Sequence, residues 1–329
     1  MSSPRVGILM PVYNVAPFIR DSVQSILDQT YRDFELLIVD DCSTDDTVTI
    51  IQSFQDNRIK LIRNEVNMGL VYGLNLGLKH LQNDYLARMD GDDLALPTRL
   101  ECQVRFMDEN ADVVMCGTQA YWEEVDHNGD FGKTYEWDYS VSDEAIRVSL
   151  LWSASFVHPS VIIRGDVFRR NQLSYDDTYT IACEDWHMWI RLSQFGLLAN
   201  LNERLVRYRI RKGSLHRSNP ALAMQLNQKV RRFYLTSLGM DDSVIRTMLK
   251  EEGLVKVEFK GLLNTYKIFF QHIQSVLDGK RLSVQIGNRM VDVFKNNKLG
   301  LISLFHIYTS GFRPDFTYLK KAIKYAFNK

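Results

Sequence analysis

Three aspartates, Asp90, Asp92 and Asp93, occupy four positions directly after an apolar run. In an extended chain, side chains two residues apart point to the same side, so Asp90 and Asp92 would present two carboxylates together. Carboxylates are ligands of the kind that Mg²⁺ and Mn²⁺ prefer, and Mg²⁺ fills the rest of its shell with water and substrate phosphates. The spacing therefore predicts a site for a metal-bound diphosphate. The alternative is a solvated acidic turn in which Asp93 caps the following helix.

A second acidic pair, Asp40 and Asp41, ends another apolar run, and Pro11 to Tyr13 follow a third. Ligands of open α/β sheets bind beyond the carboxyl ends of the strands. An aspartate at that edge can accept hydrogen bonds from a nucleobase N–H or from ribose hydroxyls, and Tyr13 can stack on the base. Two acidic pairs at neighbouring strand ends indicate a nucleotide site more strongly than either pair alone.

The elements that must position these residues alternate between two periods. Short apolar runs predict buried strands at 6–10, 34–40, 58–63, 84–90 and 112–118. Apolar residues at spacings of three and four predict helices at 16–30, 43–55, 69–81 and 98–110. Ser43 and Asp46 have the spacing of a capping box at the start of the second helix. Repeated strand–helix–strand units predict an α/β fold whose mostly parallel sheet is covered on both faces.

Beyond residue 118 this regular alternation ends. Residues 119–140 carry turn signals between aromatic residues and predict a hairpin or a long loop near a cleft. The later pattern predicts helices at 144–152 and 184–196, an extended segment at 156–164, and short strands at 197–201 and 204–210. From residue 216 the pattern is helical only. We therefore predict two domains, residues 1–215 and residues 216–329.

Composition and motifs argue against several function classes. Lys+Arg and Asp+Glu both number 40 among 329 residues, so the chain lacks the basic excess of a nucleic-acid binder. Neither G-x-G-x-x-G after a strand nor G-x-x-x-x-G-K-[ST] occurs, which argues against dinucleotide oxidoreductases and P-loop enzymes. The four cysteines form no C-x-x-C pair and predict free thiols rather than zinc ligands. The sequence contains no stretch of about 18 apolar residues, so no membrane-spanning helix is expected.

Six blocks of the sequence, in order, resemble those of family 2 glycosyltransferases, which are inverting nucleotide-sugar enzymes of the GT-A fold. The blocks cover about residues 5–215 and are ILMPVYNVAPFIRDSVQSILDQTYRDFELLIVDDCSTDDT, NMGLVYGLNLGL, DYLARMDGDDLALPTRLECQV, FVHPSVIIR, EDWHMWIRL and RLVRYRI. The resemblance is strongest to bacterial members that build lipopolysaccharide, O-antigen or capsule. It implies a Rossmann-like, mostly parallel central sheet flanked by helices, with an α-helical C-terminal extension.

The resemblance also implies roles for individual residues. Uridine is the usual base, and the residues implied to hold the nucleotide-sugar are Pro11, Tyr13, Asp41 and Asp90. Their positions add Asn67 and Gly91 as candidates for the same site. The resemblance implies that Asp92 binds the metal, Mn²⁺ or Mg²⁺. It further implies that Asp185 is the catalytic base, which takes the proton of the acceptor hydroxyl.

Three candidates for the acceptor side, His158, Glu184 and Trp186, have structural alternatives, and so does Asp185. Glu184 and Asp185 open a predicted helix, where acidic residues are common because of the helix dipole alone. His158 can equally be a satisfied histidine of the core or of a turn. Trp186 and Trp189 lie three apart on one helix face, which is as expected for packing as for a sugar platform.

Three positions depart from the family's pattern. Cys42 stands where the family usually has glycine after the paired aspartates, so a left-handed turn there would strain the backbone. Leu74 replaces an arginine, which removes any diphosphate contact of that side chain. Arg211 stands in the place of the histidine that usually follows the last block.

Two further patterns concern packing. Gly69, Gly73 and Gly77 repeat every four residues, which predicts close approach of this helix to the sheet. Arg99 and Gln103 lie one turn apart in the helix after the acidic triplet. They are expected either to brace the acidic loop or to leave Arg99 as an exposed salt-bridge partner.

The C-terminus has a basic amphipathic pattern, with Lys320, Lys321, Lys324 and Lys329 among apolar residues. Such a helix can lie on an anionic membrane surface, or it can pack on its own domain with a solvated basic face. We expect a cytoplasmic protein, with this helix as a candidate for peripheral contact on the cytosolic face of the inner membrane. The same region is a candidate contact in a homo-oligomer.

These observations predict an inverting transfer of a hexose or N-acetylhexosamine from a UDP-sugar. The acceptor would be a hydroxyl of a glycan or lipid-linked molecule in bacterial surface polysaccharide synthesis. Two alternatives stay open: a sugar-nucleotide nucleotidyltransferase, and a non-catalytic glycan-binding or scaffold protein with the same fold. The first would need a glycine-rich basic loop near the N-terminus, and PVYNVAPF at 11–18 is neither. The second would bind neither Mn²⁺ nor UDP.

Overall fold

The computed structural model describes residues 4–126, 131–211 and 219–249. The chain divides into two compact units, residues 1–146 with 154–226, and residues 147–153 with 227–329. The C-terminal lysine pattern and the turn expected at 127–130 lie outside the described residues. Within the described ranges, no helix is both long and apolar enough to cross a lipid bilayer.

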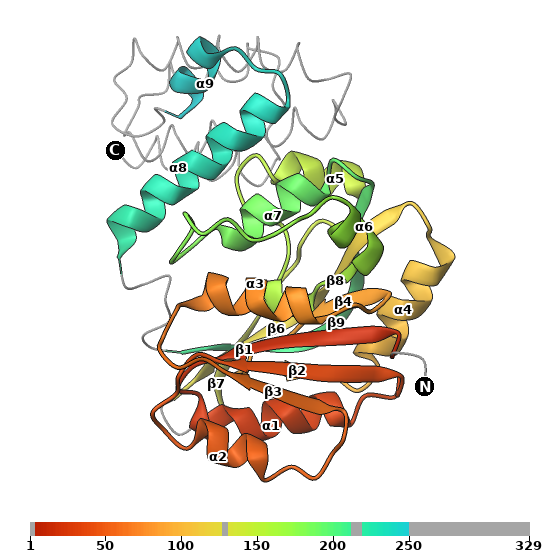
Figure 1. Cartoon of the computed structure of the whole chain (residues 1–329). Helices are drawn as coiled ribbons and strands as arrows, with labels where there is room; N and C mark the ends of the chain where they lie inside the picture. The colour runs from red at the N-terminus through yellow and green to blue at the C-terminus, as the bar shows by residue number, and fades with distance from the viewer. Residues whose placement is uncertain (1–3, 127–130, 212–218, 250–329) are drawn as a thin grey trace. The chain divides into compact units, whose positions relative to one another are not determined.

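Nine strands of the described residues form one sheet, in the order β3-β2-β1-β4-β8-β6-β9-β5, with β7 pairing to β6 (Figure 1). The strands are β1 Val6–Val12, β2 Phe34–Asp40, β3 Ile59–Arg63, β4 Tyr85–Arg88, β5 Leu94–Ala95, β6 Val113–Val125, β7 Phe131–Trp137, β8 Ile162–Arg164 and β9 Leu197–Ile210. The four strands β3-β2-β1-β4 are parallel throughout. The α/β prediction is confirmed, and the predicted hairpin at 119–140 is the antiparallel pair β6–β7.

The rest of the sheet is mixed. β8 runs antiparallel to both β4 and β6, and so lies between the strands predicted at 84–90 and 112–118, which are consecutive among the predicted strands. β9 runs parallel to β6 and antiparallel to β5. The prediction of two short strands at 197–201 and 204–210 is wrong, because these residues form the single strand β9. The pairing of β9 with β6 changes register near Thr118 and Gln119, and these shifts allow β9 to continue as one strand through its irregular middle.

Helices cover both faces of the parallel strands. α1 (Ala16–Leu27) and α2 (Thr47–Gln52) lie on one face, and α3 (Leu70–His80) lies on the other (Figure 1). Ile8, Ile26 and Ile38 are fully buried in the core that the first face forms. The remaining helices are α4 Arg99–Glu109, α5 Asp143–Ser149, α6 Gly165–Arg170, α7 Glu184–Leu192, α8 Pro220–Ser237 and α9 Asp242–Met248, with a 3₁₀ turn at His158–Ser160.

The close approach to the sheet predicted from the three glycines holds at one of them, Gly77. A Cβ on Gly77 would lie 2.1 Å from Cδ1 of Leu9, so a side chain there would push the helix away from β1. At Gly73 the nearest contact, to Cβ of Pro11, would be an ordinary 3.6 Å. Gly69 instead supplies backbone freedom, because its φ is +87° at the start of the helix.

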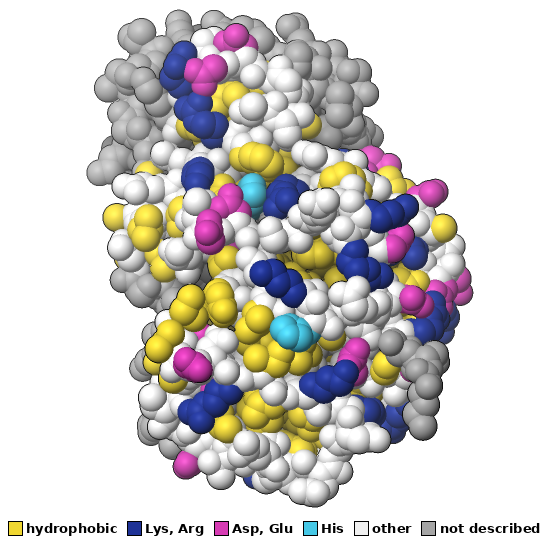
Figure 2. Space-filling view, in the orientation of Figure 1, with side chains coloured by type: hydrophobic (Ala, Val, Ile, Leu, Met, Phe, Trp, Pro, Cys, Tyr) yellow, Lys and Arg dark blue, Asp and Glu magenta, His cyan; other side chains and the backbone are white. Residues whose placement is uncertain are grey.

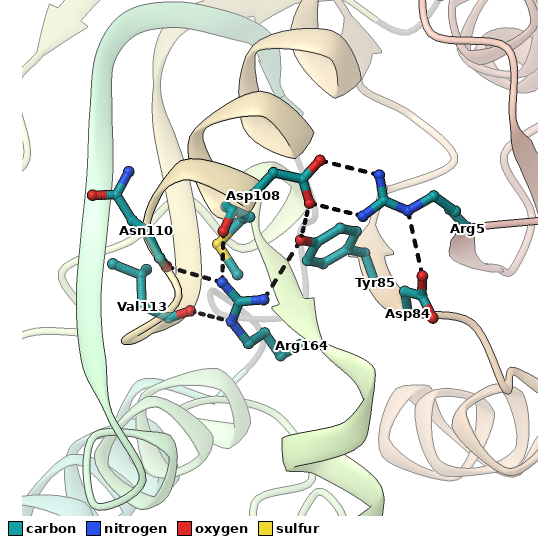
Figure 3. A network of polar contacts seen from close by, with 8 residues as sticks. Arg5, Asp84, Tyr85, Asp108, Asn110, Val113 and Arg164 are labelled. Carbon is teal, nitrogen blue, oxygen red and sulfur yellow. Dashed lines mark hydrogen bonds and ion pairs between the residues drawn. The ribbon is translucent and has the colours of Figure 1, made fainter.

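A polar network fixes the edge of the sheet where β1 and β4 begin (Figure 3). Arg5 donates to the two carboxylate oxygens of Asp108 at 3.0 and 2.7 Å, and to Asp84 at 3.3 Å. Arg164, at the end of β8, donates to three main-chain oxygens around the C-terminal end of α4, at 2.6 to 2.9 Å. The network therefore anchors the strands at one end, and the candidate functional residues lie at the other.

The second unit contains residues 147–153 and the C-terminal part of α8. Nε of Arg231 donates to the main-chain oxygen of Leu151 at 3.1 Å, and the hydroxyl of Tyr234 donates to that of Arg147 at 2.9 Å. Val230 is fully buried. Residues 147–153 are thus held by side chains that lie far along the chain.

Charged side chains are mixed on the face that Figure 2 shows. Lys and Arg side chains there are interspersed with acidic and apolar ones and do not merge into one basic surface. The view agrees with the equal numbers of basic and acidic residues in the sequence. Among the described residues on this face, Lys and Arg side chains form no continuous stripe of the kind that marks a nucleic-acid interface.

Candidate active site

Three carboxylates gather just beyond the end of β4. One oxygen from each of Asp90, Asp92 and Asp93 lies within 4.8 Å of the other two, and we call these three residues the acidic cluster. Asp90 accepts a hydrogen bond from Arg88 at 2.5 Å. Asp92 pairs with Arg211, beyond the end of β9, at 2.6 Å. The spacing in sequence thus predicted a real convergence, and the two arginines partly offset its negative charge.

Asp93 is buried and is held by β9. Its Oδ1 accepts a hydrogen bond from the backbone N–H of Arg209 at 2.7 Å. Its Oδ2 is buried and has no hydrogen-bond partner among the described residues. Burial, followed by repulsion from the other two aspartates, raises the pKa of Asp93 well above its ordinary value. The alternative role of Asp93 as a helix cap is wrong, because the next helix begins at Arg99 with Thr98 before it.

The acidic cluster fits a divalent cation in charge and in ligand type. Burial and the charge of Asp90 also raise the pKa of Asp92, so the cluster resists carrying three negative charges by itself. A cation would relieve this repulsion and would give the buried Oδ2 of Asp93 a partner. Oxygen ligands of this kind suit Mg²⁺ or Mn²⁺.

Gly91 lies between Asp90 and Asp92 in the acidic turn, and no side chain fits at its position. A Cβ there would lie 2.5 Å from Cγ1 of Val12 and 3.3 Å from Cγ2 of Val15. The backbone of the acidic turn therefore packs directly against the end of β1. This contact holds Asp90 and Asp92 at the carboxyl edge of the sheet.

Arg99 and Gln103 brace the same loop from inside the fold. Arg99 is fully buried and donates to the main-chain oxygen of Arg88 at 2.7 Å and to Oε1 of Gln103 at 3.1 Å. The amide of Gln103 donates to the main-chain oxygens of Cys116 and Ser160. Burial, and then the charge of Arg88, lowers the pKa of Arg99 to about 9. The bracing interpretation is confirmed, and the exposed salt bridge is wrong.

A second pair of carboxylates, Glu184 and Asp185, lies within electrostatic range of the acidic cluster. The pair forms the first turn of α7, directly after Cys183. Burial, followed by the charge of Asp185, raises the pKa of Glu184 to about 8, and Asp90 acts in the same direction. Asp185 is partly exposed and accepts the backbone N–H of Trp186 at 2.7 Å. The fold thus brings together two acidic groups that are far apart in sequence.

His158 lies between Glu184 and Tyr175. Its Nδ1 is 3.8 Å from Oε1 of Glu184, and its Nε2 is 3.1 Å from the hydroxyl of Tyr175. The ring stands edge-on to Trp189, with centroids 5.6 Å apart. Both descriptions of this histidine therefore hold in part, because it is satisfied by neighbours and also borders the acidic residues of α7. Trp186 is only 3% exposed, which favours packing over a sugar platform for its ring.

The residues expected around the nucleotide lie where β1 and β2 end. Pro11 is buried within β1, and Tyr13, which follows it, is 46% exposed. The backbone N–H of Asn14 donates to Oγ of Ser43 at 2.9 Å. The predicted capping box is therefore wrong: Ser43 bonds to the loop after β1, and α2 begins only at Thr47.

Asp41 holds the loop that leads into α3. Its Oδ1 accepts hydrogen bonds from the side chain of Asn64 and the backbone N–H of Met68, both at 2.8 Å, and its Oδ2 accepts from the backbone N–H of Gly69 at 2.7 Å. The side chain of Asp41 is buried, whereas Asn67 on the same loop is exposed. Sequence reasoning assigned Asp41 to the nucleotide and missed this bond set.

The three positions that depart from the family's sequence pattern have different roles in the structure. Cys42 has a φ of +64°, so the expected strained turn is present, and its Sγ contacts the main-chain oxygen of Glu65 at 3.4 Å. Leu74 is fully buried and serves packing. Arg211 contacts the acidic cluster directly through Asp92.

Two tyrosines that sequence reasoning missed, Tyr175 and Tyr208, interact electrostatically with the acidic groups. Burial raises the pKa of Tyr175 and of Tyr208 above the ordinary value. Tyr175 interacts electrostatically with Arg88 and with both carboxylates of α7. Tyr208 interacts with the acidic cluster and with Asp185. Tyr208 lies in the block RLVRYRI, where the alternation of residues along a strand was a signal that could have identified it. The sequence around Tyr175 contains no such signal.

Comparison with known proteins shows which family this chain is related to. The family model "Glycosyl transferase family 2" matches residues 7–170. An uncharacterized glycosyltransferase of Haemophilus influenzae is 30% identical over 256 residues, which cover 74% of this chain and 79% of the relative. The O-antigen biosynthesis glycosyltransferase WbnJ of Escherichia coli is 30% identical over 236 residues, 69% of this chain and 88% of the relative.

A solved structure has a similar fold. It is that of S. aureus TarS residues 1–349 in complex with UDP-GlcNAc, and the two chains superimpose with a TM-score of 0.60. The match covers 93% of this chain and 91% of that one, at 16% sequence identity. At that identity the likeness concerns the fold.

Proposed function

The chain belongs to glycosyl transferase family 2, and on that premise we propose that it moves a hexose or N-acetylhexosamine from a UDP-sugar, with inversion, to a hydroxyl of a glycan or lipid-linked acceptor. Two similarities support the donor and the pathway. WbnJ is named for O-antigen biosynthesis, and the TarS structure contains UDP-GlcNAc. We place the reaction in bacterial surface polysaccharide synthesis, in the cytoplasm or at the cytosolic face of the inner membrane.

The observation that carries the proposal is the convergence of two acidic groups on one edge of the sheet. An inverting transfer needs a base that removes the proton of the acceptor hydroxyl as it attacks the anomeric carbon. It also needs stabilisation of the nucleoside diphosphate that leaves. The carboxylates of α7 would supply the base, and the acidic cluster would supply the stabilisation of the diphosphate. Asp90 and Glu184 are close enough for the charge of one to affect the pKa of the other.

On the donor side, Asp90, Asp92 and Asp93 would hold Mn²⁺ or Mg²⁺. Bound there, the ion would supply Lewis-acid stabilisation of the leaving diphosphate. Arg88 and Arg211, which pair with Asp90 and Asp92, orient those carboxylates. Their guanidinium groups also add positive charge where the diphosphate would lie.

On the acceptor side, the two carboxylates of α7 have different environments. Glu184 is buried, and with a pKa of about 8 it holds its proton near neutral pH. Asp185 is partly exposed and is the proposed base. Neighbouring acids acquire different roles when one is buried and the other is open to solvent. A positioned base of this kind contributes about 10²–10⁴-fold to the rate.

The described residues named in this proposal all belong to the first unit of the chain. We assign the donor and acceptor sites to residues 1–215. We assign to residues 216–329 a contact role, either at the membrane surface or in a homo-oligomer.

The test is a calorimetric titration of the full chain with UDP and Mn²⁺, followed by a screen of UDP-, GDP- and dTDP-sugars for donor hydrolysis. UDP should bind in a metal-dependent way. Asp92→Ala should stay folded and lose metal-dependent turnover. Asp185→Asn should keep its UDP affinity and lose transfer by about 10²–10⁴-fold. Asp166→Asn, which changes an exposed acid on α6, is the matched control.

Three outcomes would count against the proposal. Failure of both UDP and Mn²⁺ to bind would favour a non-catalytic scaffold. Normal turnover of Asp92→Ala would remove its assigned role, and normal transfer by Asp185→Asn would do the same for the base. Preference for a GDP- or dTDP-sugar would keep the reaction class and correct the donor.

A further inference from the structure

The ribbon formed by β6, β7 and β9 carries aromatic rings on one face. Trp122 on β6 lies opposite Tyr135 on β7 and opposite Tyr208 on β9. Its ring centroid is 4.4 Å from that of Tyr208, 5.0 Å from that of Trp137 and 6.4 Å from that of Tyr139. Tyr135 and Trp137 are stacked at 5.8 Å. We call these five side chains the aromatic platform.

The platform is larger than the packing beneath it requires. Among the described residues, the buried cluster here is small: Ala120, Val157 and Val206, against which Trp122, Tyr139 and Tyr208 pack. Trp137 is 51% exposed. The opposite face of the ribbon is charged instead, where Arg207 pairs with buried Glu123 at 2.7 Å. An aromatic surface left open on one side of a strand ribbon indicates a binding surface.

The platform is continuous with both acidic groups of the candidate active site. Tyr208 interacts electrostatically with the acidic cluster and with Asp185. Tyr139 also interacts with Asp185. The ring of Trp122 contacts both tyrosines. A molecule that lies on Trp122 therefore has an edge near the proposed base.

We propose that the aromatic platform binds a pyranose ring of the acceptor and directs one of its hydroxyls toward Asp185. The inference rests on the proposed function and adds the acceptor's recognition chemistry. The C–H face of a pyranose ring is apolar and packs on aromatic faces, while its hydroxyls need polar partners at the rim. Rigid aromatic side chains with a few polar groups at the edge are typical of small-molecule sites.

Acidic side chains outnumber basic ones next to Trp137. Glu136 and Asp138 flank Trp137 along the chain, their side chains are 59% and 75% exposed, and both pair with the single guanidinium group of Arg204. Glu124 accepts a hydrogen bond from the hydroxyl of Tyr135 at 2.8 Å. Carboxylates accept hydrogen bonds from sugar hydroxyls but repel the anionic headgroups that a membrane-binding surface must attract. Charge therefore favours a carbohydrate over a lipid surface.

The experiment uses the full chain with UDP and Mn²⁺. Lactose, cellobiose and N,N′-diacetylchitobiose are titrated against protein labelled with 5-fluorotryptophan, and the fluorine signal of Trp137 is followed. At least one disaccharide should bind and shift that signal. Trp137→Ala should raise its Kd by about tenfold or more, whereas Trp137→Phe should stay within about threefold of the wild type. Phe195→Ala, which removes an exposed aromatic ring outside the platform, should change nothing.

UDP affinity, measured on the same samples, separates this inference from the proposed function. If UDP binds and no disaccharide binds, or if disaccharides bind the wild type and Trp137→Ala equally, the platform inference is overturned and the proposed function stands. If UDP does not bind, both are overturned. Binding to phosphatidylglycerol vesicles that depends on Trp137, without disaccharide binding, would overturn the inference in favour of a membrane contact.

Discussion

Glu184 should make the stability of this protein fall as the pH rises through neutrality. Burial, followed by the charge of Asp185, raises the pKa of Glu184 from 4.5 to about 8 in the folded chain. Between these values the folded chain keeps the proton and the unfolded chain has lost it. Because the unfolded state binds fewer protons in that range, the free energy of unfolding decreases with increasing pH. The contribution is complete below about pH 4.5 and is lost above about pH 8.

The pKa difference sets the size of the effect. A pKa that rises from 4.5 to about 8 corresponds to about 5 kcal/mol, of which about 4 kcal/mol should appear between about pH 5 and pH 9. The groups that face Glu184 are Asp185, Asp90, Arg88 and His158, and Arg88 opposes the shift. Glu184→Gln keeps a neutral side chain of the same size at every pH. The variant should match the wild type near pH 5 and exceed its stability by about 4 kcal/mol near pH 9.

Urea denaturation at several pH values, followed by tryptophan fluorescence, measures this difference. Trp186 and Trp189 lie on the same helix as Glu184 and report directly on it. Glu144→Gln removes an exposed acid from the first turn of α5 and is the matched control, which should follow the wild type at every pH. A gap between wild type and Glu184→Gln that stays constant across the range would refute the reasoning.

Three further predictions test the packing around the site and at the opposite edge of the sheet. Cys42→Gly should raise the free energy of unfolding by about 1 kcal/mol in urea denaturation, because glycine adopts a φ of +64° without strain; a loss would contradict this. Gly91→Ala should cost about 1–3 kcal/mol and weaken metal-dependent UDP binding in calorimetry, because its methyl group would meet Val12 at 2.5 Å. Arg164→Ala should cost about 3 kcal/mol and Arg5→Ala about 1, because the first removes three hydrogen bonds to part-buried main-chain oxygens and the second breaks surface ion pairs; equal losses would contradict the comparison.

Local periodicity identified the parallel half of the sheet because each of its strands is a short apolar run. β1 and β2 are buried at every residue, so their sequences read as continuous hydrophobic stretches. Periodicity cannot show which strands are neighbours. The insertion of β8 between β4 and β6 joins residues far apart in the chain, and the register shifts that keep β9 continuous depend on its partner β6.

The acidic cluster was visible in the sequence because its members are adjacent, but their partners were not. Arg211 and the backbone of Arg209 reach Asp92 and Asp93 only after β9 has returned to the sheet beside β5. The bonds from Asp41 to the loop before α3 are equally hidden, since nothing in the sequence of that loop shows which side chain it will meet. Residue type thus predicted the chemistry, and topology decided the geometry.

Backbone strain marks the same edge of the sheet independently of charge. Of the five described residues other than glycine with positive φ, Asn14 follows β1, Cys42 follows β2 and Cys183 precedes α7. Each of these turns directly adjoins a segment that carries a proposed site residue, and such conformations cost about 1–3 kcal/mol where the residue is not glycine. Packing alone does not call for cysteine at two of them, since glycine would adopt the same φ more easily. The strain is therefore explained best if these turns orient neighbouring site residues. Asp41 directly follows the last residue of β2, and Asp185 is the second residue of α7. On this argument Cys42→Gly should gain stability and lose UDP affinity together. A variant that gained stability without losing UDP affinity would show that the strain has no part in binding.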